Sequence, residues 1–181
     1  DSTRVVLAPG ASISWRGSYN RQVSMTGRAY FEVRHDDRRP FTVVGTHFLV
    51  SDLGTRFEIV DGVGQTRVLV TEGAVRFAGA QSRQSVELRQ GMEAVLKHNE
   101  ACPRLLAPPN TNHAVWATHR FHFDHTPLRR VLTDLEAYYG VRLRTTAPDQ
   151  LLTGDFTADS LRTLIKVIEL AMDVEIGRAH V

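Results

Sequence analysis

The sequence predicts a multi-domain chain, all-β plus α/β, in which an antiparallel β-sandwich or jelly-roll-like domain precedes a small domain of two βαβ units. In residues 4 to about 96, short β-rich runs are separated by Gly, Pro and Asp, without a helical apolar period. After Trp116, segments in which apolar and polar residues alternate, as in strands, are followed by segments with apolar residues at helical spacing. A proline-rich stretch divides the two patterns. We therefore expect the all-β domain at residues 1–105, a linker at 106–115 and the α/β domain at 116–181.

The strands of the first half are predicted from alternation. Ala29, Phe31 and Val33 alternate with polar or larger neighbours, which places one face of that strand in a core. Further β-rich runs lie at residues 41–44, 47–50, 56–59, 67–70, 75–77, 86–88 and 92–96. Gly and Asp-Gly breaks between them allow tight turns, so antiparallel hairpins, and hence a sandwich or barrel, are the expected connections.

Two helices are predicted in the second half, each between two strands. The first follows a strand containing Phe121 and Phe123; Thr126 is its expected N-cap, Pro127 its first position and Gly140 its left-handed end. Its apolar stripe comprises Leu128, Val131, Leu132, Leu135 and Tyr139. After a strand at 141–143, the second unit has strands at 151–156 and 174–176 around a helix at 160–172, capped by Asp159 or Ser160. The stripe of this helix comprises Leu161, Leu164, Ile165, Ile168 and Met172.

Composition excludes several classes of function. The 22 basic and 20 acidic residues nearly balance and are interspersed, so we expect no nucleic-acid partner. Apolar runs are only a few residues long, so no segment can span a bilayer and we expect no membrane contact within this fragment. The chain begins at Asp1 without a leader, so any anchor or export signal is expected upstream. The single Cys102 forms no intrachain disulfide.

Candidate catalytic and metal-binding residues do not form a set. In a strand, His119 and His125 would lie about 20 Å apart and His122 would point to the opposite side, so the three cannot hold one ion. His35, His47 and His98 lie on separate segments, and no Gly-x-Ser-x-Gly sequence occurs. Glu32, Glu58 and Glu72 are expected at outward positions. We predict no catalytic residue, no cofactor and no metal ligand.

Five glycine-centred or aromatic blocks of the first half, in this order, resemble the FecR-type periplasmic regulators of extracytoplasmic-function sigma factors. The blocks are Gly27-Arg28-Ala29-Tyr30-Phe31-Glu32-Val33, Arg39-Pro40-Phe41-Thr42-Val43, Leu53-Gly54-Thr55-Arg56-Phe57, Val70-Thr71-Glu72-Gly73-Ala74-Val75 and Leu88-Arg89-Gln90-Gly91.

The second half is similar to the small domain shared by such regulators, secretins and the signalling ends of TonB-dependent receptors. The similarity rests on Phe123, Thr126-Pro127-Leu128, Val131-Leu132, Leu135, Tyr138-Tyr139-Gly140-Val141 and Leu152-Thr153-Gly154-Asp155-Phe156. Relatives carry a cytoplasmic anti-sigma segment, a membrane span and, we expect, a first β-strand upstream of this chain, and they usually continue with another strand beyond residues 177–181.

The resemblance implies the periplasmic portion of a single-pass inner-membrane protein. Such a module binds the periplasmic signalling domain of an outer-membrane TonB-dependent receptor loaded with an iron complex, and so controls an extracytoplasmic-function sigma factor. The sigma factor itself is reached only through the missing cytoplasmic segment. Two other classes stay open: a carbohydrate- or small-ligand-binding β-sandwich, which requires a concave aromatic cluster, and a metalloenzyme, which requires bound metal.

Partner recognition is expected on the small domain, by edge pairing or by a helix-and-strand surface, because small open sheets leave backbone N–H and C=O groups unpaired. The candidate contacts are Phe121, Phe123, Tyr138, Leu152, Phe156, Val174 and Ile176. The alternative place for these side chains is the core of the domain.

Overall fold

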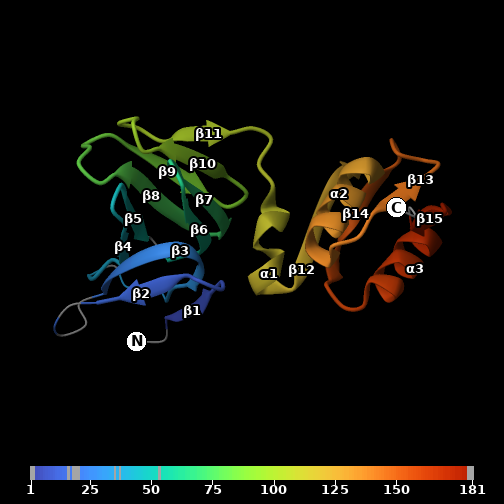
Figure 1. Cartoon of the computed structure of the whole chain (residues 1–181), viewed down its shortest axis with the longest axis horizontal. Helices are drawn as coiled ribbons and strands as arrows, with labels where there is room; N and C mark the ends of the chain where they lie inside the picture. The colour runs from blue at the N-terminus through green and yellow to red at the C-terminus, as the bar shows by residue number, and fades with distance from the viewer. Residues whose placement is uncertain are drawn as a thin grey trace. The chain divides into compact units, whose positions relative to one another are not determined.

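The computed structural model describes residues 3–15, 17, 21–34, 36, 38–52 and 54–178 (Figure 1). His35 and Leu53, both named above among the sequence features, lie outside these ranges. The chain divides into two compact units, Asp1–Thr111 and Asn112–Val181. The fold class is confirmed: the first unit is all-β and the second is α/β.

The first unit is built from eleven strands in the described residues. They are β1 (Arg4–Leu7), β2 (Ser12–Ser14), β3 (Gln22–Glu32), β4 (Thr42–Val44), β5 (Phe48–Asp52), β6 (Arg56–Gly62), β7 (Gln65–Glu72), β8 (Ala74–Gly79), β9 (Ser85–Arg89), β10 (Glu93–Lys97) and β11 (Arg104–Leu106). Their order is β11-β10-β7-β6-β3-β4-β5-β8-β9, with β1 and β2 also paired to β3. The sheet is antiparallel, as predicted, except that β3 and β4 run parallel.

The long strand β3 joins two layers. Its first half pairs with β2 and β4, and its second half pairs with β1 and β6. The change of partners occurs at Gly27, which has a φ of +83°. A Cβ at this position would lie 2.9 Å from the Cα of Ala11. Only glycine adopts this conformation at low cost, and only glycine leaves room for the approaching backbone. One continuous sheet therefore folds over into a nearly closed shape.

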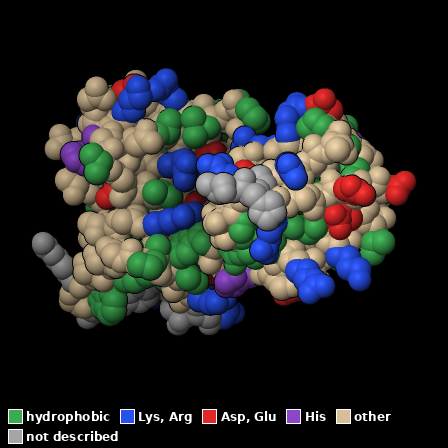
Figure 2. All heavy atoms as spheres, turned by 45° about the vertical axis from the view of Figure 1, so that its right-hand side comes forward, with side chains coloured by type: hydrophobic (Ala, Val, Ile, Leu, Met, Phe, Trp, Pro, Cys, Tyr) green, Lys and Arg blue, Asp and Glu red, His purple; other side chains and the backbone are tan. Residues whose placement is uncertain are grey.

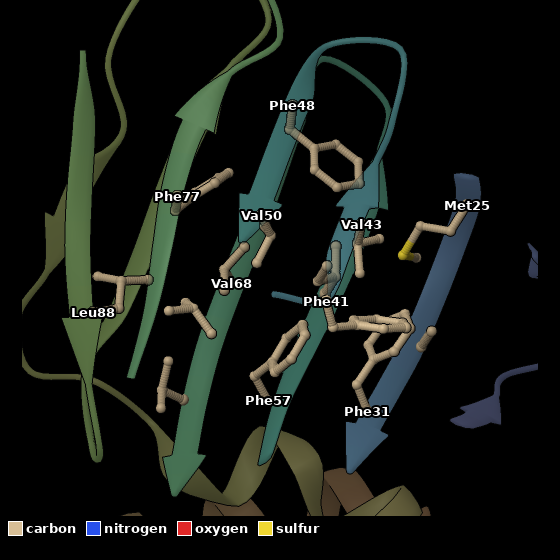
Figure 3. Close-up of a cluster of buried hydrophobic side chains, with 14 of the residues drawn as sticks. Met25, Phe31, Phe41, Val43, Phe48, Val50, Phe57, Val68, Phe77 and Leu88 are labelled. Carbon is tan, nitrogen blue, oxygen red and sulfur yellow. The ribbon is translucent and has the colours of Figure 1, made fainter. Parts of the chain in front are cut away.

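The core of the first unit lies between the two layers. Phe31 stacks on Phe57 with ring centroids 5.0 Å apart, and Phe41 approaches Phe31 at 5.9 Å. Phe48 and Phe77, from the other layer, point into the same cluster (Figure 3). The residues predicted to alternate inward, Phe31 and Phe57 among them, are buried. The outward prediction is wrong for Tyr30 and Glu58, which are 2% and 1% exposed; Arg28 donates to the Glu58 carboxylate at 2.7 Å.

Three of the glycine-centred blocks meet where the chain passes from β7 to β8. Gly73 has φ +80°, and a Cβ there would lie 2.3 Å from the carbonyl oxygen of Gly54. Thr55 Oγ1 donates a 2.6 Å hydrogen bond to the carbonyl of Ala74. The carbonyl of Gly73 accepts a hydrogen bond from the N–H of Gln90. The blocks are thus held together by backbone packing that tolerates no side chain at position 73.

The second unit has the predicted order of strands and helices. A 3₁₀ helix (Thr111–Ala114) leads into it, followed by α1 (Val115–Thr118), β12 (Arg120–Pro127), α2 (Leu128–Tyr139), β13 (Leu143–Thr145), β14 (Leu151–Thr157), α3 (Leu161–Met172) and β15 (Ile176–Arg178). The strands pair across the two βαβ units: β12 with β14, and β13 with β15, both antiparallel. Among the described residues, the two strands of one βαβ unit do not pair with each other.

The helices bury the predicted stripes. Leu128, Val131, Leu132 and Leu135 of α2 and Leu161, Leu164, Ile168 and Met172 of α3 are buried, and Tyr139 and Ile165 are partly buried. Gly140 ends α2 with φ +66°, and Ser160 caps α3 by accepting from the N–H of Thr163. The predicted cap Thr126 is wrong, because Pro127 is the N-cap and Thr126 still pairs with Leu152 in the sheet. No helix in the described ranges is long and apolar enough to cross a bilayer.

Candidate interaction surface of the second unit

Four of the seven predicted contact residues lie in the core of the second unit. Phe121, Phe123, Leu152 and Ile176 are each less than a tenth exposed. Phe121 and Phe123 stack at 5.9 Å and pack against the buried stripes of α2 and α3. A buried side chain reaches a partner only if the core opens. Their placement favours the core alternative over direct contact by these four side chains.

The other three predicted residues, Tyr138, Phe156 and Val174, are partly buried at the margin of this core. Phe156 lies 6.0 Å from Phe123, and a Cβ at Gly154 would come within 3.1 Å of its ring. The missing side chain at Gly154 therefore makes room for Phe156. Phe156 is only partly buried on the inner side of β14.

Tyr138 and Tyr139 form an aromatic group at the end of α2. Their rings are 4.8 Å apart, and the ring of Tyr138 lies edge-on to Phe121 at 5.5 Å. The hydroxyl of Tyr139 donates to the carbonyl of Asp159 at 2.6 Å. Burial raises the pKa of Tyr139, and the nearby Tyr138 and Asp159 add to the effect. The Tyr138 hydroxyl is 3.1 Å from Nδ1 of His119.

The solvent-facing side of the β12–β14 sheet is polar apart from Leu151, and we call it the outer face. It consists of the exposed residues that alternate with the buried ones: Arg120, His122, Asp124, Leu151, Thr153, Asp155 and Thr157. Nδ1 of His122 is 2.8 Å from Oδ1 of Asp155 on the neighbouring strand. The predicted contacts do not include this face, because they are the apolar members of each alternating strand. The same alternation, applied to the polar members, identifies it.

Figure 2 shows side chains of both charges dispersed over the side of the molecule in view.

Two glutamates accept the first outward N–H group of each strand in the β13–β15 sheet. Glu136 Oε1 accepts a 2.6 Å hydrogen bond from the N–H of Leu143, at the start of β13. Glu169 Oε1 accepts one of 2.8 Å from the N–H of Ile176, at the start of β15. Each glutamate precedes its donor by seven residues, so the two βαβ units use the same device. An exposed sheet edge that lacks such acceptors is a template for another strand.

The outward N–H groups of β12 are also satisfied. The N–H of Arg120 donates to Thr118 Oγ1, that of His122 to Asn112 Oδ1 and that of Asp124 to Thr126 Oγ1, at 3.4, 2.8 and 3.2 Å. These side chains come from β12 itself and from the segment that leads into it. The outer edge of β12 is thus occupied by the protein's own acceptors.

Three histidines of the second unit, His119, His122 and His125, have separate partners. His119 contacts Tyr138, His122 contacts Asp155, and His125 contacts Asp124 at 2.7 Å. Among residues 3–178, where described, no three His, Cys, Asp or Glu side chains converge in a group that could hold a metal ion. The geometry offers sites for hydrogen bonds and ion pairs to a partner.

The first unit has a hollow of about 610 Å³ beside two stacked histidines. The rings of His47 and His98 are 4.1 Å apart, and His98 Nε2 lies 3.2 Å from Thr66 Oγ1. A carbohydrate-binding sandwich requires aromatic rings in a concavity. In the described part of the first unit, no Phe, Tyr or Trp lines this hollow.

Comparison with known proteins identifies relatives for both units. The family profile described as FecR protein matches residues 1–76, and that described as FecR, C-terminal, matches residues 120–179. Two crystal structures of a candidate anti-sigma factor from Parabacteroides distasonis share the fold. One is 20% identical with a TM-score of 0.58, covering 99% of this chain and 92% of that one. The other is 21% identical with a TM-score of 0.57, covering 97% and 85%.

A comparison with curated proteins gives no match. The two profiles describe the two parts of one type of protein. They match this chain in the expected order, one within each compact unit, and leave residues 77–119 unmatched. Together they cover most of its residues, and the fold agrees from end to end with that of the bacterial structures. The chain belongs to the FecR family.

Proposed function

We propose that this chain is the periplasmic signal-transducing module of a transmembrane anti-sigma factor, and that it binds the signalling domain of an outer-membrane TonB-dependent receptor. Through this contact the full protein controls an extracytoplasmic-function sigma factor in uptake signalling of the iron–siderophore type. The sigma factor is contacted by a cytoplasmic segment of the full protein. The module itself acts by recognition, without catalysis.

One observation carries the proposal: both units match the two profiles of the FecR family, in order. Regulation through protein contacts is the activity of this family, and the related P. distasonis structures are those of a candidate anti-sigma factor. The chemistry of the second unit supports a binding role. Its outer face exposes Asp155 and Asp124 at 69% and 70% of their side-chain surface, and His122 and His125 each pair with one of these carboxylates.

A calorimetric titration tests the proposal. The whole chain is titrated with the periplasmic signalling domain of the TonB-dependent receptor encoded nearby, and the signalling domain of an unrelated receptor serves as the control. We expect saturable binding of the first and none of the second. Absence of binding at high micromolar concentrations would contradict the proposed function.

A charge-reversal pair locates the contact. Asp155→Lys changes the outer face of the second unit, and Glu87→Lys makes the same change on β9 of the first unit, where Glu87 forms a surface ion pair with Arg89. We expect weaker binding with Asp155→Lys and unchanged binding with Glu87→Lys. The reverse result would place recognition on the first unit. In cells, the same Asp155→Lys change in the full-length protein should reduce the transcriptional response to the receptor's iron complex.

A further inference from the structure

The geometry points to β14 as the strand that receives the partner: we propose that an extended segment of the partner pairs with the free edge of β14 and continues the β12–β14 sheet. This inference rests on the proposed function and specifies how the second unit makes its contact. It follows from where each outward backbone group of the second unit finds a hydrogen-bond partner.

The hydrogen bond of His122 shows which way the backbone groups of β12 and β14 point. The N–H of His122 donates to Asn112 and therefore points away from β14. In an antiparallel pair, opposite residues either exchange both backbone hydrogen bonds or neither. His122 and Asp155 are opposite each other, and therefore Asp155 also turns its N–H and C=O away from the pair. Side chains approach most closely at such positions, in agreement with the 2.8 Å contact between His122 and Asp155.

The same direction holds for every second residue of β14. Thr157 lies opposite Arg120, whose N–H also points away from β14. Thr153 lies opposite the bulge of β12; its neighbours Gly154 and Leu152 direct their backbone N–H and C=O groups toward β12, so Thr153 directs its own groups away. Thr153, Asp155 and Thr157 therefore present three N–H and three C=O groups in a row. Within the described part of the chain, no hydrogen bond reaches these backbone groups.

The other three strands contrast with β14. The outward N–H groups of β12 are accepted by Thr118, Asn112 and Thr126, and the first ones of β13 and β15 by Glu136 and Glu169. Native proteins usually blunt exposed sheet edges, and an edge left open is a site for strand addition. β14 is the longest unblunted edge that the described residues of the second unit offer.

Charge and shape define the segment that fits. On its inner side β14 has Gly154, without a side chain, and the partly buried Phe156, so an apolar side chain of the added strand can cover Phe156. On its outer side Asp155 is 69% exposed and Asp124 is 70% exposed. An Arg or Lys of the added strand would face Asp155. The occupant is an extended segment that alternates apolar and polar residues and carries a basic residue at its centre.

A second copy of this chain fits less well. Antiparallel pairing of two β14 strands about Asp155 would place two carboxylates directly opposite each other, which destabilises a cross-strand pair. An added strand with a basic residue gains an attraction at the same place. Self-association through β14 is therefore an outcome that the experiment must separate from binding of the partner.

Amide hydrogen exchange of the whole chain tests the inference. In the free chain, we expect fast exchange at Thr153, Asp155 and Thr157, and slower exchange at Leu143 and Ile176. With saturating receptor signalling domain, the three β14 amides should become protected by about tenfold or more. Slow exchange at these amides in the free monomer, or protection that grows with the concentration of the chain alone, would overturn the inference. Binding without protection at β14 would also overturn it, while leaving the proposed function intact. No binding would contradict both.

Two substitutions at one position separate the backbone from the side chain. Asp155→Pro removes one outward N–H, keeps the pairing with β12 and follows Gly154, which accommodates a proline after it. Asp155→Ala removes the carboxylate and keeps the N–H. We expect the proline variant to bind the signalling domain about tenfold more weakly than the alanine variant. Equal affinities of the two folded variants would contradict strand addition. If the proline variant does not fold, the exchange experiment on the unmodified chain decides.

Discussion

Glu136 accepts the backbone N–H of Leu143 at 2.6 Å, and this contact ties the end of α2 to the beginning of β13. Its side chain is 19% exposed, so the carboxylate is largely withdrawn from water. A charged acceptor on a partly buried N–H is worth more than a neutral surface hydrogen bond. The contact also removes a donor from the sheet edge.

We predict that Glu136→Ala lowers the free energy of unfolding by about 1.5–3 kcal/mol, because the N–H of Leu143 loses its charged acceptor. Glu136→Gln retains an acceptor oxygen and should cost less than about 1.5 kcal/mol. Denaturant unfolding measures both, and amide exchange at Leu143 should accelerate only in the alanine variant. Equal stability of Glu136→Ala and the unmodified chain would show that water replaces the carboxylate without cost.

Alanine substitutions at two glycines with the same backbone conformation distinguish the cost of backbone strain from the cost of steric overlap. Gly91 has φ +78° and no atom within 4 Å of the place where a Cβ would lie, whereas Gly73 has φ +80° and a backbone oxygen 2.3 Å from that place. Gly91→Ala should cost about 1–2 kcal/mol, the usual strain of a left-handed alanine. Gly73→Ala should cost roughly 3 kcal/mol or more, since the carbonyl of Gly54 must also move. Thermal unfolding of both variants gives the comparison, and equal costs would refute the close packing of the two blocks.

The placement of Phe121 in the core predicts a large loss of stability on truncation. Phe121→Ala should lower the free energy of unfolding by about 3–5 kcal/mol, the usual cost of removing a buried aromatic ring. Leu151→Ala is the matched control, because Leu151 is 54% exposed and should change stability by no more than about 0.5 kcal/mol. A stable Phe121→Ala variant that has lost partner binding would instead support direct contact by this side chain.

Tyr139 predicts a loss of stability at high pH. Burial raises its pKa above the ordinary value of 10.0, so the folded state retains the phenolic proton more strongly than the unfolded state. The resulting stabilisation is complete below pH 10 and is lost as the pH rises through the folded pKa. Tyr139→Phe removes this dependence, together with the hydrogen bond to Asp159. Unfolding free energies of both proteins, measured from pH 8 to 11, should therefore converge as the pH rises; a constant difference would contradict the prediction.

The sequence predicted the elements of this fold well because their signals are local. Alternation at Phe121 and Phe123 indicates a strand with one buried face, and the stripe from Leu128 to Leu135 indicates an amphipathic helix. The cap of the second helix, Ser160, is one of the two residues predicted for it, Asp159 being the other. At Thr126 the same reasoning failed, since pairing with Leu152 extends the strand to the first turn of the helix.

The interaction surface was harder to predict. Apolar residues of alternating strands were chosen as contacts, yet a unit of this size needs Phe121, Phe123 and Leu152 to form its own core. The polar residues between them, such as His122 and Asp155, face the solvent. No local pattern distinguishes an exposed residue that binds a partner from one that only meets water.

By itself, the sequence determined the two-part organisation, most of the strands, the two long helices and the family to which the chain belongs, because periodicity, turn residues and glycine-centred blocks are read along the chain. It did not predict β1, β2, β11 or α1. Only the tertiary structure decided which strands pair, that β3 serves two layers and that the outward N–H groups of β14 meet no acceptor among the described residues. These features depend on contacts such as Asn112 with His122, Glu136 with Leu143 and Glu169 with Ile176. A backbone N–H is the same group in every residue, and whether it is free is set by what the fold brings next to it.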